Sequence, residues 1–215
     1  MVAVVRKTSA ERREEIAHAV LRIIGEQGIT SFTTTALAKE IGVTSGALFR
    51  HFASRDEILQ EAVRYAVVKI EETFPDRSLP ATVRLVQLAR NRVRLLGSEP
   101  GIVWLLRSEQ AHLTLPKGAI DLLDSLIKRS QQYLLDAIRE GGRQGTIRDD
   151  IKPDILLVLV MGTIHALLGM PGIRRPSTRR RSPDPDLILS ALMRMIAPGQ
   201  TTKKEIQTRE RSKQK

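Results

Sequence analysis

Apolar residues recur at the spacing of an amphipathic helix along most of the chain. The clearest case is residues 9–28, in which one face carries Ile16, Ala19, Val20, Ile23 and Ile24. Acidic residues in the first turns and a glycine after the last turn match the charge and cap preferences of helix ends. No segment shows the period-two alternation of a half-buried strand. We therefore predict an all-α fold.

A short helix is predicted directly after Thr33, whose hydroxyl can cap its first turn. The spacing of Leu37, Ala38 and Ile41 turns these three side chains toward the core. Gly42 follows at the point where the pattern stops, so we expect the helix to end there.

A second short helix is predicted to begin at Thr44. It turns Leu48 inward together with either Phe49 or Phe52, a choice that the pattern leaves open. Ser54 then precedes a longer helical stretch, RDEILQEAVRYAVVKIEETF, which has acidic residues in its first turn. The later helices are predicted at 81–97, 100–113, 117–140, 153–170 and 185–197.

The composition fits helices packed on helices. Hydrophobic residues make up 41% of the chain but aromatic residues only 3%, so the core must consist mainly of aliphatic side chains. Because the chain has no cysteine, it forms neither a disulfide nor a thiolate metal site. Its 4 histidines are scattered. We expect no metal and no cofactor.

The net charge of +11 is concentrated in three segments: residues 1–8, the arginine-rich segment 174–181 (RRPSTRRR) and the tail 203–215. The remainder of the chain is balanced. Such segments attract phosphate independently of sequence, but solvated tails and loops have the same composition. The sequence leaves open whether the arginine-rich segment and the tail touch DNA.

The longest apolar run, residues 155–170, is shorter than the roughly 20 residues that a membrane span needs, and it contains His165. The N-terminal stretch MVAVVRKTSAERREE lacks the apolar segment of a signal peptide. We expect a helix buried in protein, no membrane partner and a cytoplasmic location.

Residues 33–52 meet the requirements of a helix-turn-helix, whose second helix enters the major groove of DNA. The outward face of that second helix carries Ser45, Gly46, Ala47 and Arg50. Small residues let the backbone come close to base edges. Ser45 can hydrogen-bond a base, Ala47 can contact a thymine methyl group, and Arg50 can reach guanine or phosphate.

The stretch 31–59, SFTTTALAKEIGVTSGALFRHFASRDEIL, resembles the DNA-binding domain of the TetR family of bacterial transcriptional regulators. The resemblance is strong over residues 9–60 and weaker over 141–162; elsewhere it rests on helix number and size. With the predicted helices, it divides the chain into a three-helix helix-turn-helix DNA-binding domain with a short N-terminal arm (1–54), a C-terminal helical bundle for ligand binding and dimerisation (55–198) and a basic tail (199–215). We expect the tail to be disordered.

The resemblance also implies which residues contact DNA. Phosphate contacts fall to Thr33 or Thr34, Thr44, His51 and Arg55, and base contacts to Ser45, Gly46, Ala47 and Arg50. Position 49 departs from the family, which usually has tyrosine there. With Phe49, a phosphate hydrogen bond worth roughly 1 kcal/mol is absent or is replaced by one from Arg50, and Phe49 is then a packing residue. His51 is alternatively a structural helix-end histidine.

Two identical recognition helices require a dimer and palindromic DNA. Residues 155–170 hold more apolar side chains than one core-facing stripe needs, and residues 185–197 have a second apolar face. We predict an interface of two helices from each subunit; the alternative is that these helices are internal to one subunit. The candidate interface residues are Leu156, Leu159, Val160, Thr163, Leu187, Ile188, Ala191, Leu192 and Met195.

In the TetR family a small molecule inside the C-terminal bundle often changes the spacing of the recognition helices. Residues 102–116 (IVWLLRSEQAHLTLP) place polar groups among leucines, as a pocket wall does. The candidate ligand contacts are Trp104, Arg107, Gln110, His112, Tyr133 and His165. An aliphatic lining favours a lipophilic effector, which the sequence does not identify. The alternative is that these side chains are ordinary core and surface residues.

We therefore expect a homodimeric DNA-binding regulator, a repressor that a small molecule releases from its operator. The alternative is the same fold used as a ligand-independent chromosome-binding or adaptor protein, whose bundle is fully packed. No Gly-rich phosphate loop, nucleophile elbow or pair of acids on one face is present, so we expect no enzyme.

Overall fold

The computed structural model describes residues 8–168 and 184–199, and every regular element within them is a helix. The elements are α1 (Ser9–Gln27), the short 3-10 helix η1 (Ile29–Ser31), α2 (Thr34–Glu40), α3 (Ser45–Leu48), α4 (Arg55–Glu71), α5 (Ala81–Ser98), α6 (Pro100–Arg107), α7 (Glu109–Thr114), α8 (Lys117–Arg143), α9 (Pro153–Leu167) and α10 (Pro185–Ile196). The predicted all-α fold is confirmed. The N-terminal residues 1–7, the arginine-rich segment 174–181 and the tail from residue 200 lie outside the described residues.

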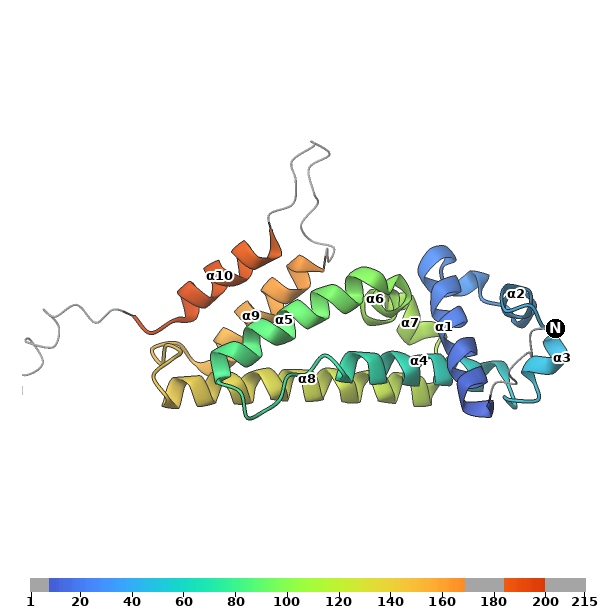
Figure 1. Ribbon diagram of the computed structural model, residues 1–215, viewed down its shortest axis with the longest axis horizontal. Helices are drawn as coiled ribbons and strands as arrows, with labels where there is room; N and C mark the ends of the chain where they lie inside the picture. The colour runs from blue at the N-terminus through green and yellow to red at the C-terminus, as the bar shows by residue number, and fades with distance from the viewer. Residues whose placement is uncertain (1–7, 169–183, 200–215) are drawn as a thin grey trace, which may run out of the picture.

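The helices form an elongated body with α1, α2 and α3 at one end and α9 and α10 at the other (Figure 1). The long helix α8 runs beside α4, α5 and α9, and so connects the two ends. Helix α10 packs on α9 and α5.

The helix ends follow the local signals in the sequence. Thr33, Thr44 and Ser54 each accept a hydrogen bond from the backbone amide three residues further on, at 3.0, 3.3 and 3.1 Å. Gly28 ends α1 with φ of 80°, and Gly42 follows α2 with φ of 70°, a region that favours glycine. The predicted caps at Thr33, Thr44 and Ser54 are confirmed. Helix α2 ends at Glu40, slightly before Gly42, and α3 ends at Leu48, so Arg50, predicted on this helix, follows it.

The segment 100–113 was predicted as one helix, and the structure corrects this. It is divided at Ser108, whose backbone is extended, into α6 and α7. Leu105 and Ala111 are both buried in the same apolar cluster. Six residues apart on one straight helix, they would point about 120° away from each other. The break allows both to face the core.

The buried apolar side chains form two clusters. The larger is continuous from α1 and α2 through α4 and α6 to the first half of α8, and the smaller joins α5, the second half of α8, α9 and α10. The end that carries α1, α2 and α3 therefore shares its core with the bundle. The domain boundary at residue 54 stays a prediction.

Candidate DNA-binding surface and effector cavity

Helices α2 and α3 are joined by a tight turn at Gly42. The amide of Val43 donates to the carbonyl oxygen of Ala38 at 2.9 Å, and the amide of Gly42 to that of Lys39 at 3.3 Å. Leu37 and Leu48 are fully buried beneath the two helices. This turn fixes α3 across α2, with its remaining side chains outward.

The outward face of α3 is small and open. Gly46 is exposed, and a Cβ built on it would meet nothing within 4 Å. Ser45 and Ala47 are half-buried beside it. Arg50 is exposed just after the helix and forms no hydrogen bond or ion pair to any residue in the described ranges. The four predicted base-contacting residues therefore lie on one accessible surface.

The structure decides between the two phenylalanines. Phe52 is 2% exposed and belongs to the core, whereas Phe49 is 47% exposed. A pure packing role for Phe49 does not fit this exposure, which it shares with the neighbouring Arg50.

The predicted phosphate-binding threonines lie at helix starts. Thr33 and Thr44 use their hydroxyl oxygen to accept the cap hydrogen bonds, which leaves each O–H available as a donor to an outside acceptor. Thr34 is the half-buried first residue of α2.

The other two predicted phosphate contacts are partly engaged within the protein. His51 Nδ1 lies 3.5 Å from Ser9 Oγ. The Arg55 guanidinium stacks 5.1 Å from the centre of the Phe32 ring and donates to the Phe32 carbonyl oxygen at 3.5 Å. Its planar fork has further N–H groups for a phosphate.

Arg13 positions this surface, although the sequence analysis did not single it out. From the first turns of α1 it donates to the carbonyl oxygen of His51 at 2.6 Å and to Glu61 at 2.9 Å, and it forms a longer ion pair with Glu57. Its guanidinium lies 4.3 Å from the centre of the Phe52 ring. A single side chain thus connects α1, the end of the recognition segment and α4. The available sequence signal was the acidic pair at 57 and 61, one helical turn apart.

These contacts perturb the ionisation of the participants. The hydrogen bond to Glu61 raises the pKa of Arg13. The pKa of Glu57 is lowered, first by the hydrogen bond that it accepts from the Ala53 amide at 2.6 Å and then by Arg13. Both groups are therefore charged at neutral pH.

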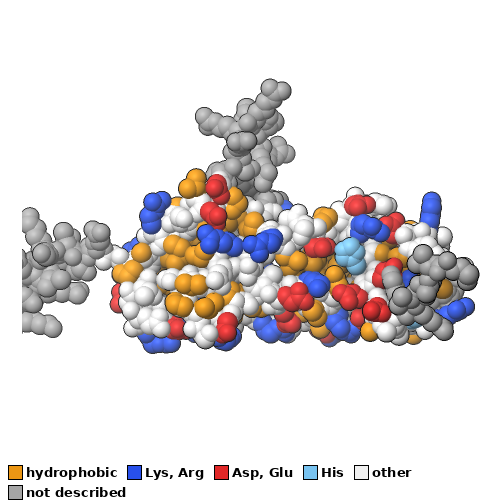
Figure 2. All heavy atoms as spheres, viewed as in Figure 1, with side chains coloured by type: hydrophobic (Ala, Val, Ile, Leu, Met, Phe, Trp, Pro, Cys, Tyr) orange, Lys and Arg blue, Asp and Glu red, His pale blue; other side chains and the backbone are white. Residues whose placement is uncertain are grey.

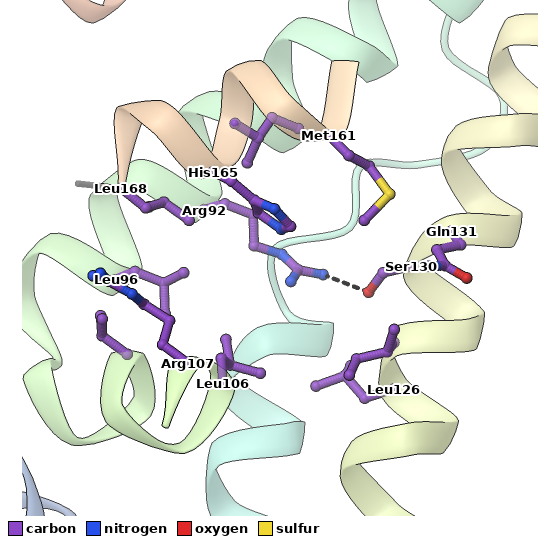
Figure 3. A pocket seen from close by; sticks show the side chains of 13 residues that line it. Arg92, Leu96, Leu106, Arg107, Leu126, Ser130, Gln131, Met161, His165 and Leu168 are labelled. Carbon is purple, nitrogen blue, oxygen red and sulfur yellow. Dashed lines mark hydrogen bonds between the residues drawn. The ribbon is translucent and has the colours of Figure 1, made fainter. Parts of the chain in front are cut away.

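A cavity of about 270 Å³ lies inside the bundle, between α5, α6, α8 and α9 (Figure 3). Its lining is mostly aliphatic, with a few polar groups. The lining residues are Arg92, Leu96, Val103, Leu106, Arg107, Leu126, Ile127, Ser130, Gln131, Met161, Ile164, His165 and Leu168.

Two of the predicted ligand contacts, Arg107 and His165, line this cavity. Burial lowers the pKa of His165. The Nε of Arg107 is buried and has no hydrogen-bond partner among the described residues.

The other four predicted ligand contacts lie elsewhere. Trp104 packs against the larger apolar cluster, and Gln110 and His112 are exposed on α7, which the break at Ser108 turns away. Tyr133 is buried, and its O–H donates to the Pro75 carbonyl oxygen at 2.8 Å. Its ring packs on Phe74.

Arg92 was missed and is the most prominent polar group of the cavity. Its Nε donates to Thr73 Oγ1 at 2.5 Å and its Nη2 to Ser130 Oγ at 3.2 Å. The guanidinium also lies 5.0 Å from the centre of the Phe74 ring. Burial lowers the pKa of Arg92 to about 10.

Helices α9 and α10 leave an apolar surface exposed at the end opposite to α3 (Figure 2). We call it the α9–α10 face; its large side chains, between 42% and 68% exposed, are Ile155, Val158, Leu159, Leu187 and Met195. Of the other predicted interface residues, Thr163, Ile188 and Ala191 are half-buried.

The remaining three interface predictions are corrected. Leu156, Val160 and Leu192 are buried in the smaller apolar cluster of their own subunit, so they have no surface to offer a partner. Ile155 and Val158, which were not predicted, point outward instead.

None of the helices within 8–168 and 184–199 is long and apolar enough to cross a membrane. In the same ranges no three side chains of the His, Asp and Glu types are grouped to hold a metal ion.

Known proteins with similar sequences or folds include regulators of the tetR family. The sequence model of the bacterial regulatory proteins of the tetR family matches residues 16–62. The chain is 26% identical over 181 residues to the nucleoid occlusion factor SlmA of Marinobacter nauticus, covering 78% of this chain and 89% of that one. It is 21% identical over 159 residues to the HTH-type transcriptional repressor KstR2 of Mycolicibacterium smegmatis, covering 72% and 76%. Among solved structures, the fold is similar to that of AibR in complex with isovaleryl coenzyme A and operator DNA, with a TM-score of 0.67, 20% identity and coverage of 86% and 98%.

Proposed function

Because the chain belongs to the TetR family of bacterial transcriptional regulators, we propose that it is a ligand-responsive repressor, a homodimer that binds palindromic operator DNA and releases it when a small molecule enters the cavity. The observation that carries this proposal is the open outward face of α3. Ser45, Gly46 and Ala47 lie on this helix, and the exposed Phe49 and Arg50 follow directly after it.

On DNA, the outward face of α3 lies in the major groove. The absence of a side chain at Gly46 lets the backbone approach the base edges, and Arg50 supplies the long donor that can select a guanine. Thr33, Thr44 and Arg55 flank this face and bind phosphate, which sets the register of α3 but not its sequence preference.

The dimer forms through the α9–α10 face. Contiguous exposed apolar side chains such as Val158, Leu159 and Leu187 favour burial against a second copy. Helix α3 lies at the opposite end of each subunit from this face. For both recognition helices to reach the same DNA duplex, the two subunits must therefore pack at an angle, in a V shape, about the twofold axis. Operator half-site spacing then reports that geometry.

Two contacts connect the cavity with the DNA-binding end. Arg92 holds Thr73, just after α4, while the first turn of α4 carries Arg55 next to the recognition segment. Helix α6 lines the cavity and touches α1 so closely that a Cβ on Gly101 would come 2.0 Å from the Leu21 carbonyl oxygen. A ligand that moves α5 or α6 thus shifts α4 and α1, and through them α3.

The relatives support both halves of the proposal. AibR, whose fold is similar, binds isovaleryl coenzyme A and operator DNA in one structure. KstR2 is a transcriptional repressor. As a protein that binds chromosomal DNA, this regulator would act at the nucleoid in the cytoplasm.

The similarity to SlmA favours a second candidate, a nucleoid occlusion factor that acts on the chromosome through protein partners. The cavity discriminates between the two. In the repressor, a ligand in the cavity weakens operator binding; in the nucleoid factor, DNA binding is insensitive to small molecules that fit it.

The first test is selection of bound sequences from a random DNA pool by the full-length protein at near-physiological salt. A palindromic consensus supports the dimeric regulator and supplies the operator for effector screens. Salt-sensitive binding without a consensus contradicts it, because that is the behaviour of nonspecific phosphate attraction. The same pool selected with Arg50→Ala separates base contacts from backbone contacts.

A further inference from the structure

We infer that the ligand of the cavity is a small amphiphilic anion, with a carboxylate or phosphate head that binds Arg92 and a compact apolar body. This inference rests on the proposed function, since it names the chemical class of the effector. Carboxylate and phosphate share the planar, bidentate recognition that a guanidinium provides, and the test below tells the two apart.

The Arg92 side chain is held in place by neighbouring groups on one side and is open on the other. Its Nε and Nη2 are held by Thr73 and Ser130, from the α4–α5 connection and from α8. Its Nη1 forms no hydrogen bond to a described residue. In Figure 3 the guanidinium reaches into the space between α8 and α9, near His165 and Met161. The side chain is therefore oriented before any ligand arrives, which lowers the entropy that binding costs.

The cavity carries the positive charge of two arginines and no acidic side chain. Neither Arg92 nor Arg107 forms an ion pair within the described residues, and the cavity lining contains no acidic side chain. Burial lowers the pKa of Arg92 to about 10, so the group is still a cation at neutral pH although it is poorly solvated. Arg92 and Arg107 are both half-buried, and a partly desolvated cation without a counter-ion is unfavourable. An anionic head group in the cavity removes that cost, whereas a cationic ligand increases it.

The remaining lining of the cavity is mostly aliphatic. Leucine, isoleucine, valine and methionine side chains from four helices surround Arg92. The cavity of about 270 Å³ lies just below the roughly 300–1,000 Å³ of typical ligand pockets, so it suits a compact ligand. The Ser130 hydroxyl, which accepts from Arg92, keeps its own hydrogen for the head group. His165, kept neutral by burial, offers a further donor without adding charge.

The test compares ligands of equal shape on the full-length protein. Octanoate, octyl phosphate, octanamide and octylamine are titrated separately by calorimetry, with hexanoate and decanoate to bracket the length. The variants are Arg92→Gln, Arg92→Lys and, as a matched control, Arg94→Gln, which removes an exposed arginine from the same helix α5 outside the cavity. Thermal unfolding of each variant checks that it is folded.

We expect at least one of the two anions to bind about tenfold or more tightly than octanamide, because a charged hydrogen bond contributes at least that factor. Arg92→Gln should reduce this preference to within about threefold, whereas Arg92→Lys and Arg94→Gln should retain most of it. The tighter anion of the two names the head group. Octylamine should bind most weakly.

Binding of octanamide as tight as that of the tighter of the two anions overturns the inference, as does an anion preference that survives in Arg92→Gln, or a lack of binding by all four ligands. These results are distinguishable from failure of the proposed function. If octanamide binds equally well and releases the operator, the cavity is an effector site of another chemical class. If ligands bind and the operator is never released, the ligand-responsive repressor itself is wrong.

Discussion

Replacing Gly101 by alanine tests whether the contact between α1 and α6 holds the DNA-binding end against the bundle. Gly101 lies on α6 and faces the backbone of Leu21 on α1, and Gly25 of α1 is its counterpart. A Cβ at position 101 would lie 2.0 Å from the Leu21 carbonyl oxygen, 2.5 Å from its carbonyl carbon and 2.8 Å from its Cα. All three neighbours are backbone atoms, so no side-chain rotation relieves the overlap.

The size of the effect follows from this geometry. Ordinary contacts of a Cβ begin at 3.4 Å, so the two helices must separate by more than about 1 Å, in a region where cores are packed at crystal density. Overpacking of this kind typically costs about 1–3 kcal/mol, and the rigid backbone places this site near the upper end. Alanine regains about 0.5–1 kcal/mol as the better helix former. We expect a net loss of roughly 2 kcal/mol in the free energy of unfolding.

The assay is urea and thermal unfolding at fixed protein concentration, with Gly97→Ala as the matched control. Gly97 is a helical glycine on α5, and a Cβ there would meet nothing within 4 Å. The control should be neutral or slightly stabilised, whereas Gly101→Ala should melt roughly 4–8 °C below the wild type. If Gly101→Ala unfolds like the wild type, or if both variants lose stability equally, the close α1–α6 contact does not exist as described.

Three further predictions concern the surfaces of the molecule. Arg50→Ala should weaken operator binding by about 1–3 kcal/mol and relax the preference at one base pair, measured by titration on matched and mutated operators. The free energy of unfolding should not change, because the side chain is exposed. Unchanged affinity and preference would remove Arg50 from the DNA contacts. Val158→Asp on the α9–α10 face should convert the dimer to a monomer in sedimentation experiments. The control Val68→Asp, at an exposed position of α4, should leave the dimer intact. A dimer that survives Val158→Asp would place the interface elsewhere. Because a backbone amide and then Arg13 hold the pKa of Glu57 below its ordinary value, its contribution to stability is present at neutral pH and disappears as the pH falls through the acidic range. Glu57→Gln should therefore be less stable than the wild type at neutral pH, with the difference shrinking at acidic pH in unfolding experiments; a constant difference would contradict the assignment.

The arginines of α5 show which features of the site the sequence could not predict. Four arginines lie on α5, on different sides of the helix, and their environments differ completely. Arg84 is buried and paired with Glu140, Arg90 forms a surface ion pair with Asp186, and Arg94 is exposed. The fourth, Arg92, enters the cavity. Only the helices packed around α5 distinguish them, and these helices come from distant parts of the chain.

Three of the interface residues, Leu156, Val160 and Leu192, were misplaced for a related reason. Helix α9 is apolar on nearly every side, so its sequence has no polar face to show which way it is turned. The structure turns Leu156 and Val160 into the subunit core and leaves Ile155 and Val158 outside. Three of the nine candidate interface residues are therefore buried in the subunit core, and the interface through α9 and α10 stays a prediction.

What the sequence determined by itself is local. The threonine and serine caps, the glycines at 28 and 42 and the helical spacing of apolar residues set the N-terminal helices and the helix-turn-helix, because each signal acts within a few residues of where it stands. The tertiary structure decided whatever depends on orientation between helices: the burial of Phe52 instead of Phe49, the break at Ser108 and the set of side chains around the cavity. Those outcomes depend on contacts between segments tens of residues apart, which the pattern along any one segment does not contain.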